Sequence, residues 1–205
     1  MVAMGTPLHE VSGKSERSKT AKIAKVFQLR VDLRGTRPKI WRRIVVPATI
    51  KLPTLHVVLL RAMGWQGGHL HEFLFGDVNY GRPETEWDLP DGVQDETRVS
   101  LRKALDGGST FTWVYDYGDN WQHKIKVERA VDMGVPLDSP MCITGQGACP
   151  PEDVGGVPGY EHFLAAIADP SHPEHAELKD WCGGAFDPAA FDVAEVQQRL
   201  DEITL

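Results

Sequence analysis

Residues 110–129 read TFTWVYDYGDNWQHKIKVER and carry the strongest hairpin pattern in the chain. Apolar and polar side chains alternate on both sides of Gly118-Asp119-Asn120, which is typical of a β-hairpin. The alternation predicts one strand from Thr110 to Tyr117 and a second from Trp121 to Arg129. Each strand is expected to bury one face: Phe111, Trp113, Tyr115 and Tyr117 on the first, and Trp121, His123, Ile125 and Val127 on the second.

Three more strands and one helix are predicted upstream of this hairpin. Alternation over residues 26–33 and 40–46, on either side of turn residues 35–38, predicts a second hairpin. Residues 54–63 carry apolar side chains at helical spacing, with Thr54 as the expected N-cap and Gly64 as the C-cap. Alternation resumes over residues 69–75 and places His69 and His71 on the same strand face.

The regions on either side of the 110–129 hairpin are less regular. Residues 76–98 are rich in Asp, Glu, Pro and Gly, so we expect a long surface connection, followed by a short helix over 99–105. Residues 136–158 contain too many Pro and Gly for regular structure and are expected to form an ordered loop. Helices are predicted at 158–168, 173–181 and 193–200, the last with Asp192 and Glu195 at capping-box spacing.

This order of elements predicts an α+β fold. Hairpins with an early helix, followed by C-terminal helices, favour a single compact domain with an antiparallel or mixed sheet over a doubly wound parallel sheet. The domain is expected to span residues 25–205. Residues 1–24 have too few large apolar groups to offset the entropy of ordering, and we interpret them as a flexible basic tail.

Charge is unevenly distributed along the 205 residues, whose formal net charge is −7. Residues 1–50 hold 11 basic and 3 acidic side chains, a balance of +8, whereas residues 51–205 hold 11 basic and 26 acidic ones, a balance of −15. No apolar run approaches the roughly 18 residues that cross a bilayer, and the N-terminus lacks the apolar core of a secretory signal. The expected location is therefore the cytoplasm, with no membrane partner.

Six motifs occur in a fixed order along the chain. They are Ile40-Trp41-Arg42-Arg43-Ile44, Ala62-Met63-Gly64-Trp65, His69-Leu70-His71-Glu72-Phe73, Tyr115 to His123, Gly147 to Asp153, and Phe186-Asp187-Pro188. Through these motifs, the region from about Val26 to Leu200 resembles the bacterial plasmid pRiA4b open-reading-frame-three family. The resemblance implies a compact single α+β domain, and it implies little about activity.

Members of that family are often labelled as transposon-associated, resolvase-like proteins. A serine recombinase needs a nucleophilic serine within a cluster of arginines, and no serine of this chain lies in an arginine-rich motif. The residues therefore do not support the resolvase label. The family also often has a third cysteine where this chain has Val154, which weakens any site that would need that ligand.

Histidines and cysteines are the candidate metal ligands. Zinc accepts thiolates and imidazoles in tetrahedral geometry. The usual closely spaced pair of cysteines is absent, so the alternative interpretation is that the thiols are buried and the histidines are hydrogen-bonded within the fold. The cofactor stays unknown, and zinc or another divalent metal is the candidate. The candidate ligands are His69, His71, His123, Cys142 and Cys149.

Carboxylates beside the hairpin turn and in the Pro/Gly-rich loop are candidate binding residues. Such groups could hold a hard cation through oxygen ligands, as phosphoryl-transfer enzymes do. Asp and Asn at turns also bond their own backbone, which is the alternative role. The candidates are Asp116, Asp119, Glu152 and Asp153, together with Trp121, whose ring would line a ligand site if it were exposed.

Nucleic acid is a second candidate partner, besides protein. Basic residues of the tail and of the first hairpin, Arg42 and Arg43 among them, would make binding salt-dependent. The alternative is that Arg42 and Arg43, on opposite faces of one strand, pair with acidic groups of the same fold. We therefore predict a binding or interaction module of a mobile-element-associated family, and the alternative is a metal-dependent enzyme acting on nucleic acid or a phosphorylated substrate.

Overall fold

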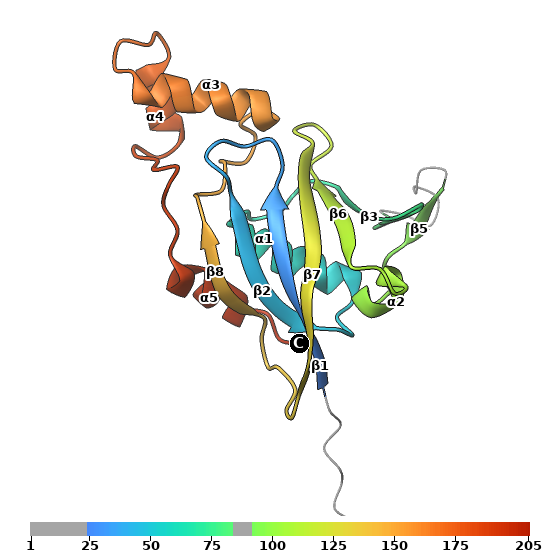
Figure 1. Cartoon of the computed structure of the whole chain (residues 1–205). Helices are drawn as coiled ribbons and strands as arrows, with labels where there is room; N and C mark the ends of the chain where they lie inside the picture. Colours follow the sequence, from blue (N-terminus) through green and yellow to red (C-terminus); the bar gives the residue numbers. More distant parts are fainter. Residues whose placement is uncertain (1–23, 84–91) are drawn as a thin grey trace, which may run out of the picture.

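The computed structural model describes residues 24–83 and 92–205. The predicted tail therefore lies outside the described residues, except for Ala24. An eight-stranded sheet in the order β5-β4-β3-β6-β7-β1-β2-β8 forms the centre of the molecule (Figure 1). All neighbouring strands are antiparallel except β4 and β5, which are parallel. The strands are β1 (Ala24–Leu33), β2 (Trp41–Pro47), β3 (His71–Phe75), β4 (Val78–Gly81), β5 (Val93–Asp95), β6 (Thr110–Tyr115), β7 (Trp121–Met133) and β8 (Met141–Gln146).

Five helices accompany the sheet in the described part of the chain. They are α1 (Leu52–Met63), α2 (Leu101–Leu105), α3 (Gly156–Ala168), α4 (His175–Trp181) and α5 (Val193–Asp201). Figure 1 shows α1 and α5 behind the sheet and α3 with α4 beyond one end of it. The α+β prediction, with an early helix and C-terminal helices on a mostly antiparallel sheet, is confirmed.

The core forms between the sheet and α1. Alternation over the two predicted hairpins places Leu29, Ile44 and Trp113 in this core, where each is fully buried. Leu55 and Leu59 of α1 pack into the same cluster. Burial of such side chains stabilises each by about 1.5–3 kcal/mol, so the hairpin patterns and the helix support one another.

Two loop predictions are wrong in part. Residues 141–146 of the predicted Pro/Gly-rich loop form β8, which pairs with β2 despite a bulge between Arg43 and Ile44. Within the predicted connection 76–98, residues 78–81 and 93–95 form β4 and β5, and residues 84–91 lie outside the described part of the chain. These short strands lie at or beside the two edges of the sheet. Edge strands need no fully apolar face, so their sequences carry little alternation.

Of two predicted N-cap residues, one caps its helix and the other does not. Asp192 caps α5 as predicted, since its Oδ1 accepts hydrogen bonds from the backbone N–H of Ala194 and of Glu195. The Thr54 N-cap prediction is wrong, because α1 begins at Leu52 and Lys51 occupies the cap position. Pro53 fits the first turn of the helix, where its missing N–H has no intrahelical partner to lose. No helix in the described ranges is long and apolar enough to cross a membrane.

Candidate metal site at the turn between β6 and β7

The turn between β6 and β7 is organised by Asp116. This residue has a left-handed φ of 58°, and its Oδ1 accepts hydrogen bonds from the N–H of Gly118 at 2.9 Å and of Asp119 at 3.3 Å. Asp tolerates this backbone conformation because its short side chain bonds the local backbone. One carboxylate oxygen of Asp116 is therefore occupied by the turn, and the other oxygen is available to a ligand.

The loop after β8 docks onto this turn. Asp119 Oδ2 accepts a hydrogen bond from the N–H of Gly155 at 3.2 Å. The next residue, Gly156, has a φ of 66°, and a Cβ there would collide with the carbonyl oxygen of Asp119. Only glycine permits this close approach of two backbones.

Glu152 fastens the same loop to two other segments. Its Oε1 accepts a hydrogen bond from the Tyr115 hydroxyl at 2.7 Å, and its carboxylate also accepts from the N–H of Gln66 at 3.2 Å and of Gly67 at 3.3 Å. Trp65 adds a bond from its indole N–H to the carbonyl of Pro150 at 3.0 Å. Because the Glu152 carboxylate already has three donors, its role is to position the loop.

His69 meets two carboxylates at this junction. Its Nδ1 lies 3.5 Å from Asp116 Oδ2, and its Nε2 lies 3.3 Å from Asp153 Oδ1. One ligand atom from each of the three residues lies within 4.8 Å of the others. The Asp116 side chain is nearly buried, whereas that of Asp153 is 71% exposed. An ion held here would be supported from inside and open to solvent on the Asp153 side.

His71 lies in a different environment from His69. We predicted both on one strand face, but β3 begins only at His71, and Gly67 and Gly68 before it have positive φ angles. His71 points into the core, where its Nε2 lies 3.1 Å from both carboxylate oxygens of the fully buried Glu96. The alternation therefore does not extend back to His69, whose ring turns toward Asp116 instead.

A polar cavity of about 480 Å³ lies beside His69. It is lined by His56, Gly68, His69, Leu70, His71, Arg82 and Pro83. The rings of His56 and His71 stack with centroids 3.5 Å apart. Burial, with smaller contributions from the neighbouring His71 and Arg82, lowers the pKa of His56 to about 3, so His56 is neutral near pH 7. Sequence reasoning missed His56 and Glu96, since nothing in a polar connection indicates that Glu96 is buried.

The other three predicted metal ligands are not part of this junction. His123 is fully buried, donates from Nδ1 to the Trp113 carbonyl at 3.3 Å, and has a pKa that burial lowers to about 3. Burial raises the pKa of Cys142 and of Cys149, and both are free thiols. Of the five residues, all within the described ranges, only His69 belongs to a group of three candidate ligands.

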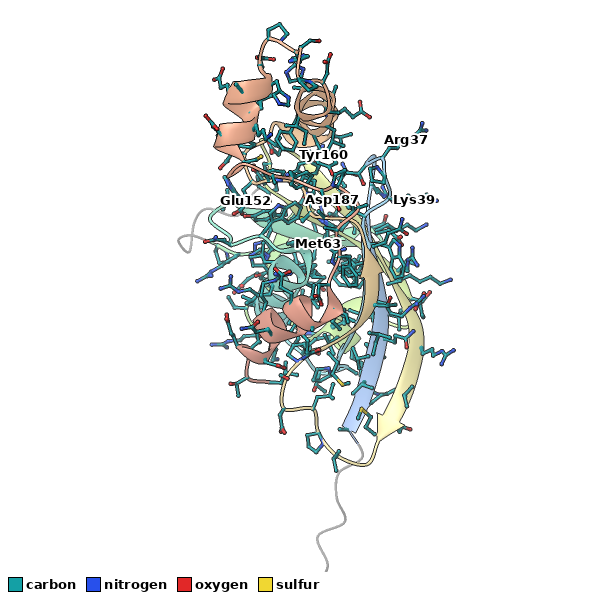
Figure 2. The ribbon with its side chains drawn as sticks, turned by 90° about the vertical axis from the view of Figure 1, so that its left-hand side faces the viewer. Arg37, Lys39, Met63, Glu152, Tyr160 and Asp187 are labelled. Carbon is teal, nitrogen blue, oxygen red and sulfur yellow. The ribbon has the colours of Figure 1, made fainter. Side chains whose placement is uncertain are left out.

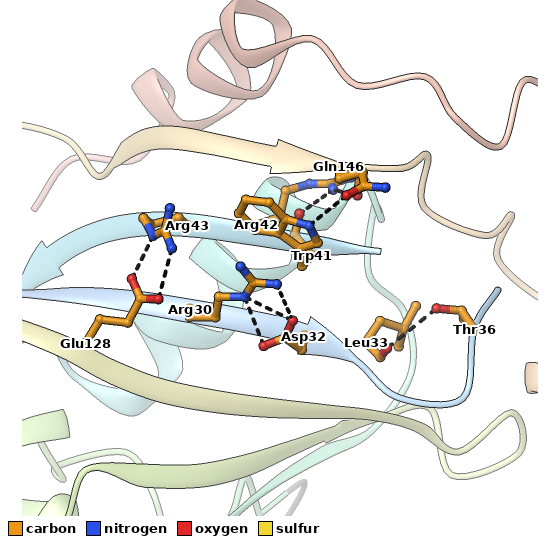
Figure 3. A network of polar contacts seen from close by, with 9 residues as sticks. All are labelled: Arg30, Asp32, Leu33, Thr36, Trp41, Arg42, Arg43, Glu128 and Gln146. Atoms are coloured by element: carbon orange, nitrogen blue, oxygen red, sulfur yellow. Dashed lines mark hydrogen bonds and ion pairs between the residues drawn. The ribbon is translucent and has the colours of Figure 1, made fainter. Parts of the chain in front are cut away.

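Three predicted binding residues have structural roles. Trp121 is 1% exposed and packs against Trp65, with ring centroids 5.8 Å apart. The buried Arg42 donates to the carbonyls of Trp41, Ala62, Met63 and Gln146 at 2.9–3.5 Å. Arg43 forms a two-pronged ion pair with Glu128 at 2.6 and 3.0 Å (Figure 3). The two arginines therefore bond within the fold.

A second group of candidate ligands lies on α3 and the segment before α4. Ligand atoms of His162, His172 and Glu174 lie within 4.8 Å of one another, and His162 Nε2 lies 2.6 Å from Glu174 Oε2. The side chains of His162 and Glu174 are each about half exposed. This group has no buried member, in contrast to the junction around His69.

A family model, a relative and a solved structure are similar to this chain. The model of a family described as plasmid pRiA4b ORF-3-like protein matches residues 25–195. The uncharacterized protein y4hQ of Sinorhizobium fredii (strain NBRC 101917 / NGR234) is 45% identical over 184 residues, which cover 88% of this chain and 93% of the relative. The crystal structure of MM3350, a protein of unknown function from Methanosarcina mazei Go1, matches with a TM-score of 0.76 and 32% identity, covering 85% of this chain and 98% of that one.

Proposed function

The chain belongs to the plasmid pRiA4b ORF-3-like protein family, and we propose that this member is a binding module that holds a divalent cation at His69, Asp116 and Asp153. The observation that supports the proposal is the convergence of these three side chains from three separate segments. His69 precedes β3, Asp116 follows β6, and Asp153 lies in the loop between β8 and α3. The N–H of Asp116 donates to the carbonyl of Leu70 at 2.9 Å, and the Glu152 carboxylate accepts from the N–H of Gln66 and of Gly67, so these contacts hold the segments together.

The chemistry of the three ligands favours zinc or manganese. A neutral imidazole with two carboxylates carries a charge of −2, which balances one divalent cation. Magnesium and calcium prefer oxygen ligands alone, whereas zinc and manganese accept the mixture of nitrogen and oxygen. Three protein ligands also leave coordination positions open toward solvent, where a carboxylate or phosphate of a partner would bind.

The experiment that tests the proposal is calorimetric titration of the metal-free full chain with Zn²⁺, Mn²⁺ and Mg²⁺. We expect binding of Zn²⁺ or Mn²⁺ at one ion per chain and a raised melting temperature, because a ligand bound only to the folded state stabilises it. Substituting His69→Ala or Asp153→Asn should remove this binding. Both side chains are partly exposed, so the folded state should survive, which circular dichroism checks.

The group around His162 supplies the matched control. A His162→Ala, Glu174→Gln variant removes an exposed imidazole and a carboxylate from the other candidate cluster. If it binds metal like the unmodified chain, the ion is held at His69. If this variant loses metal binding while His69→Ala keeps it, the ion is bound by the second cluster instead. If the unmodified chain binds no metal, the proposal is refuted.

A metal-dependent enzyme is the second candidate, and the cavity beside His69 favours it. Arg82 lines that cavity and would attract an anionic group next to the ion. Under this alternative, purified protein with Zn²⁺ or Mn²⁺ hydrolyses p-nitrophenyl phosphate or bis(p-nitrophenyl) phosphate, and Asp153→Asn abolishes the activity. Tight metal binding without turnover of either ester would leave the binding module as the function.

A further inference from the structure

The face of the sheet opposite α1 and α5 is open over β2, β1 and β7, since none of the helices in ranges 24–83 and 92–205 covers it (Figure 1). Its side chains are those that alternate with the buried ones along each strand. They include Arg30 and Asp32 of β1, Trp41 and Arg43 of β2, and Lys124, Lys126 and Glu128 of β7.

Strand register brings these cations together. Arg30 lies opposite Arg43 on one side and opposite Lys126 on the other. One row further, Asp32 lies between Trp41 and Lys124. Like charges directly across a sheet repel one another, so rows of this kind need neutralising partners.

The fold neutralises only part of this charge. Asp32 accepts from Arg30 at 2.8–3.1 Å, and Glu128 is bound by Arg43 (Figure 3). The guanidinium carbon of Arg30 also lies 3.8 Å from the centroid of the Trp41 ring. Arg30 and Arg43 are therefore each paired with an acidic group, and Asp32 and Glu128 are already engaged within the fold.

Three further cations lie beside Lys124 at the adjoining hairpin end. Arg34, Arg37 and Lys39 of the connection between β1 and β2, together with Lys124, are exposed. They line a cavity of about 450 Å³ with Arg30, Asp32, Leu33, Gly35, Thr36 and Ile40. None of the four has a carboxylate of residues 24–83 or 92–205 within 4.0 Å.

The connection itself is a built structure. The Thr36 side chain is buried and its hydroxyl donates to the Leu33 carbonyl at 3.5 Å, while Gly35, with a φ of 82°, packs against Val157 of α3. Figure 2 shows Arg37 and Lys39 extending outward on the side of the molecule away from Glu152. The cations are thus presented on an ordered support, on the other side from the candidate metal site.

We propose that this basic surface, defined by Arg30, Arg34, Arg37, Lys39, Lys124 and Lys126, binds the phosphates of a single-stranded nucleic acid. The net charge of −7 does not oppose this, because the positive groups are gathered on one face and end of the sheet while the acidic excess lies elsewhere in the sequence. An open sheet that carries cations beside an aromatic ring suits a single strand, whose bases and backbone are both accessible. The cavity fits one phosphate group surrounded by donors.

Fluorescence anisotropy of the full chain with labelled 20-nucleotide single strands of RNA and DNA tests the proposal. We expect binding that weakens steeply between about 50 and 300 mM KCl. With Arg34, Arg37, Lys39, Lys124 and Lys126 neutralising phosphates, the plot of log affinity against log salt should have a slope of about −3.5. A duplex of the same sequence should bind at least about tenfold more weakly, and equal or tighter duplex binding would overturn the single-strand assignment.

Three full-length variants that each remove three positive charges locate the site. The first variant changes the basic surface by Arg34→Gln, Arg37→Gln and Lys39→Gln. It should weaken binding at least about tenfold and make the slope of log affinity against log salt shallower by about 2. The second variant changes exposed cations in and next to α2 by Arg98→Gln, Arg102→Gln and Lys103→Gln. The third changes the basic N-terminal segment by Lys14→Gln, Lys19→Gln and Lys22→Gln. Both control variants should stay within about twofold of the unmodified chain.

Each other outcome counts against the proposal. Equal weakening by all three variants would show a general charge effect, and loss of binding only in the Lys14, Lys19 and Lys22 variant would move the interaction to the N-terminal segment. No binding of either strand at about 50 mM KCl would also overturn it. Since the substituted side chains at the hairpin end are exposed, unchanged circular dichroism excludes unfolding as the cause of a loss.

Discussion

The hydroxyl of Tyr115 donates a 2.7 Å hydrogen bond to Oε1 of Glu152, a residue 37 positions further along the chain. Burial and the neighbouring carboxylate raise the pKa of Tyr115, so the phenol keeps its proton and acts as the donor. This bond joins the end of β6, next to Asp116, to the loop that carries Asp153.

Removing that hydroxyl should loosen the metal site. We expect Tyr115→Phe to cost about 1.5 kcal/mol or more of unfolding free energy, because a hydrogen bond to a carboxylate is lost while the ring stays packed. Affinity for Zn²⁺ or Mn²⁺ should fall about tenfold, as supporting contacts around metal sites usually contribute. Calorimetric titration measures the affinity, and Tyr117→Phe is the control, since Tyr117 is 48% exposed and donates only a long bond to the His71 carbonyl. Equal affinity in Tyr115→Phe and the unmodified chain would show that the bond from Tyr115 to Glu152 does not support the metal site.

The two neighbouring arginines of β2 should differ strongly in their effect on stability. Arg42→Met would leave the carbonyls at the end of α1 without their buried donor, and we expect a loss of about 3 kcal/mol or more. Arg43→Gln breaks a partly exposed ion pair with Glu128 and should cost about 1 kcal/mol. Urea unfolding of the two variants gives both values, and similar costs would contradict the buried capping role of Arg42.

A close approach of two backbones predicts a contrast between two glycines. Gly156→Ala must relieve both a positive φ and the collision with the Asp119 carbonyl, whereas Gly183→Ala faces only a positive φ, with nothing within 4 Å of its new Cβ. We expect about 1 kcal/mol of destabilisation for Gly183→Ala and about 3 kcal/mol for Gly156→Ala. Thermal unfolding compares the variants. Metal binding should be lost only in Gly156→Ala, because its loop carries Asp153.

Acid should destabilise the protein through its buried histidines. The pKa of His123 and of His56 is about 3 in the folded state, against about 6.5 in an unfolded chain. The unfolded chain therefore binds protons first, so the stability that these neutral rings contribute is complete above pH 6.5 and is lost as the pH falls toward 3. Each of the two histidines should lower the free energy of unfolding by up to about 1.4 kcal/mol for each pH unit between 6.5 and 3.

Urea unfolding at pH 7, 6 and 5 measures this dependence. In a His123→Leu variant that still folds, the slope of unfolding free energy against pH should be about half as steep, because one of the two titrating groups is gone. A slope that His123→Leu leaves unchanged would assign the acid sensitivity to other groups.

Alternation of apolar residues was sufficient to predict β1, β2, β3, β6 and β7, because each of these strands buries one face in a shared core. The same reasoning could not find β4, β5 and β8. Backbone hydrogen bonds to neighbouring strands set their pairing. A single large side chain, such as Tyr80 in β4 or Cys142 in β8, gives too little alternation to indicate a strand. Burial of Glu96 beside His71 likewise depends on a distant strand, and its polar surroundings in the sequence conceal it.

Residue patterns alone predict that the chain forms an α+β domain, where its principal hairpins and its last helix cap lie, and that histidines and carboxylates occur in the motifs shared with its family. Which of these side chains meet depends on tertiary packing. His69, His71 and His123 look equivalent in the sequence. In the structure His69 faces two carboxylates, His71 faces a buried glutamate, and His123 lies in the core. Local patterns fix which face of an element is buried, because they depend on spacing along one strand or helix. Which groups share a site depends on how separate segments dock, and here a single loop held by Glu152 and Gly156 brings Asp153 to His69.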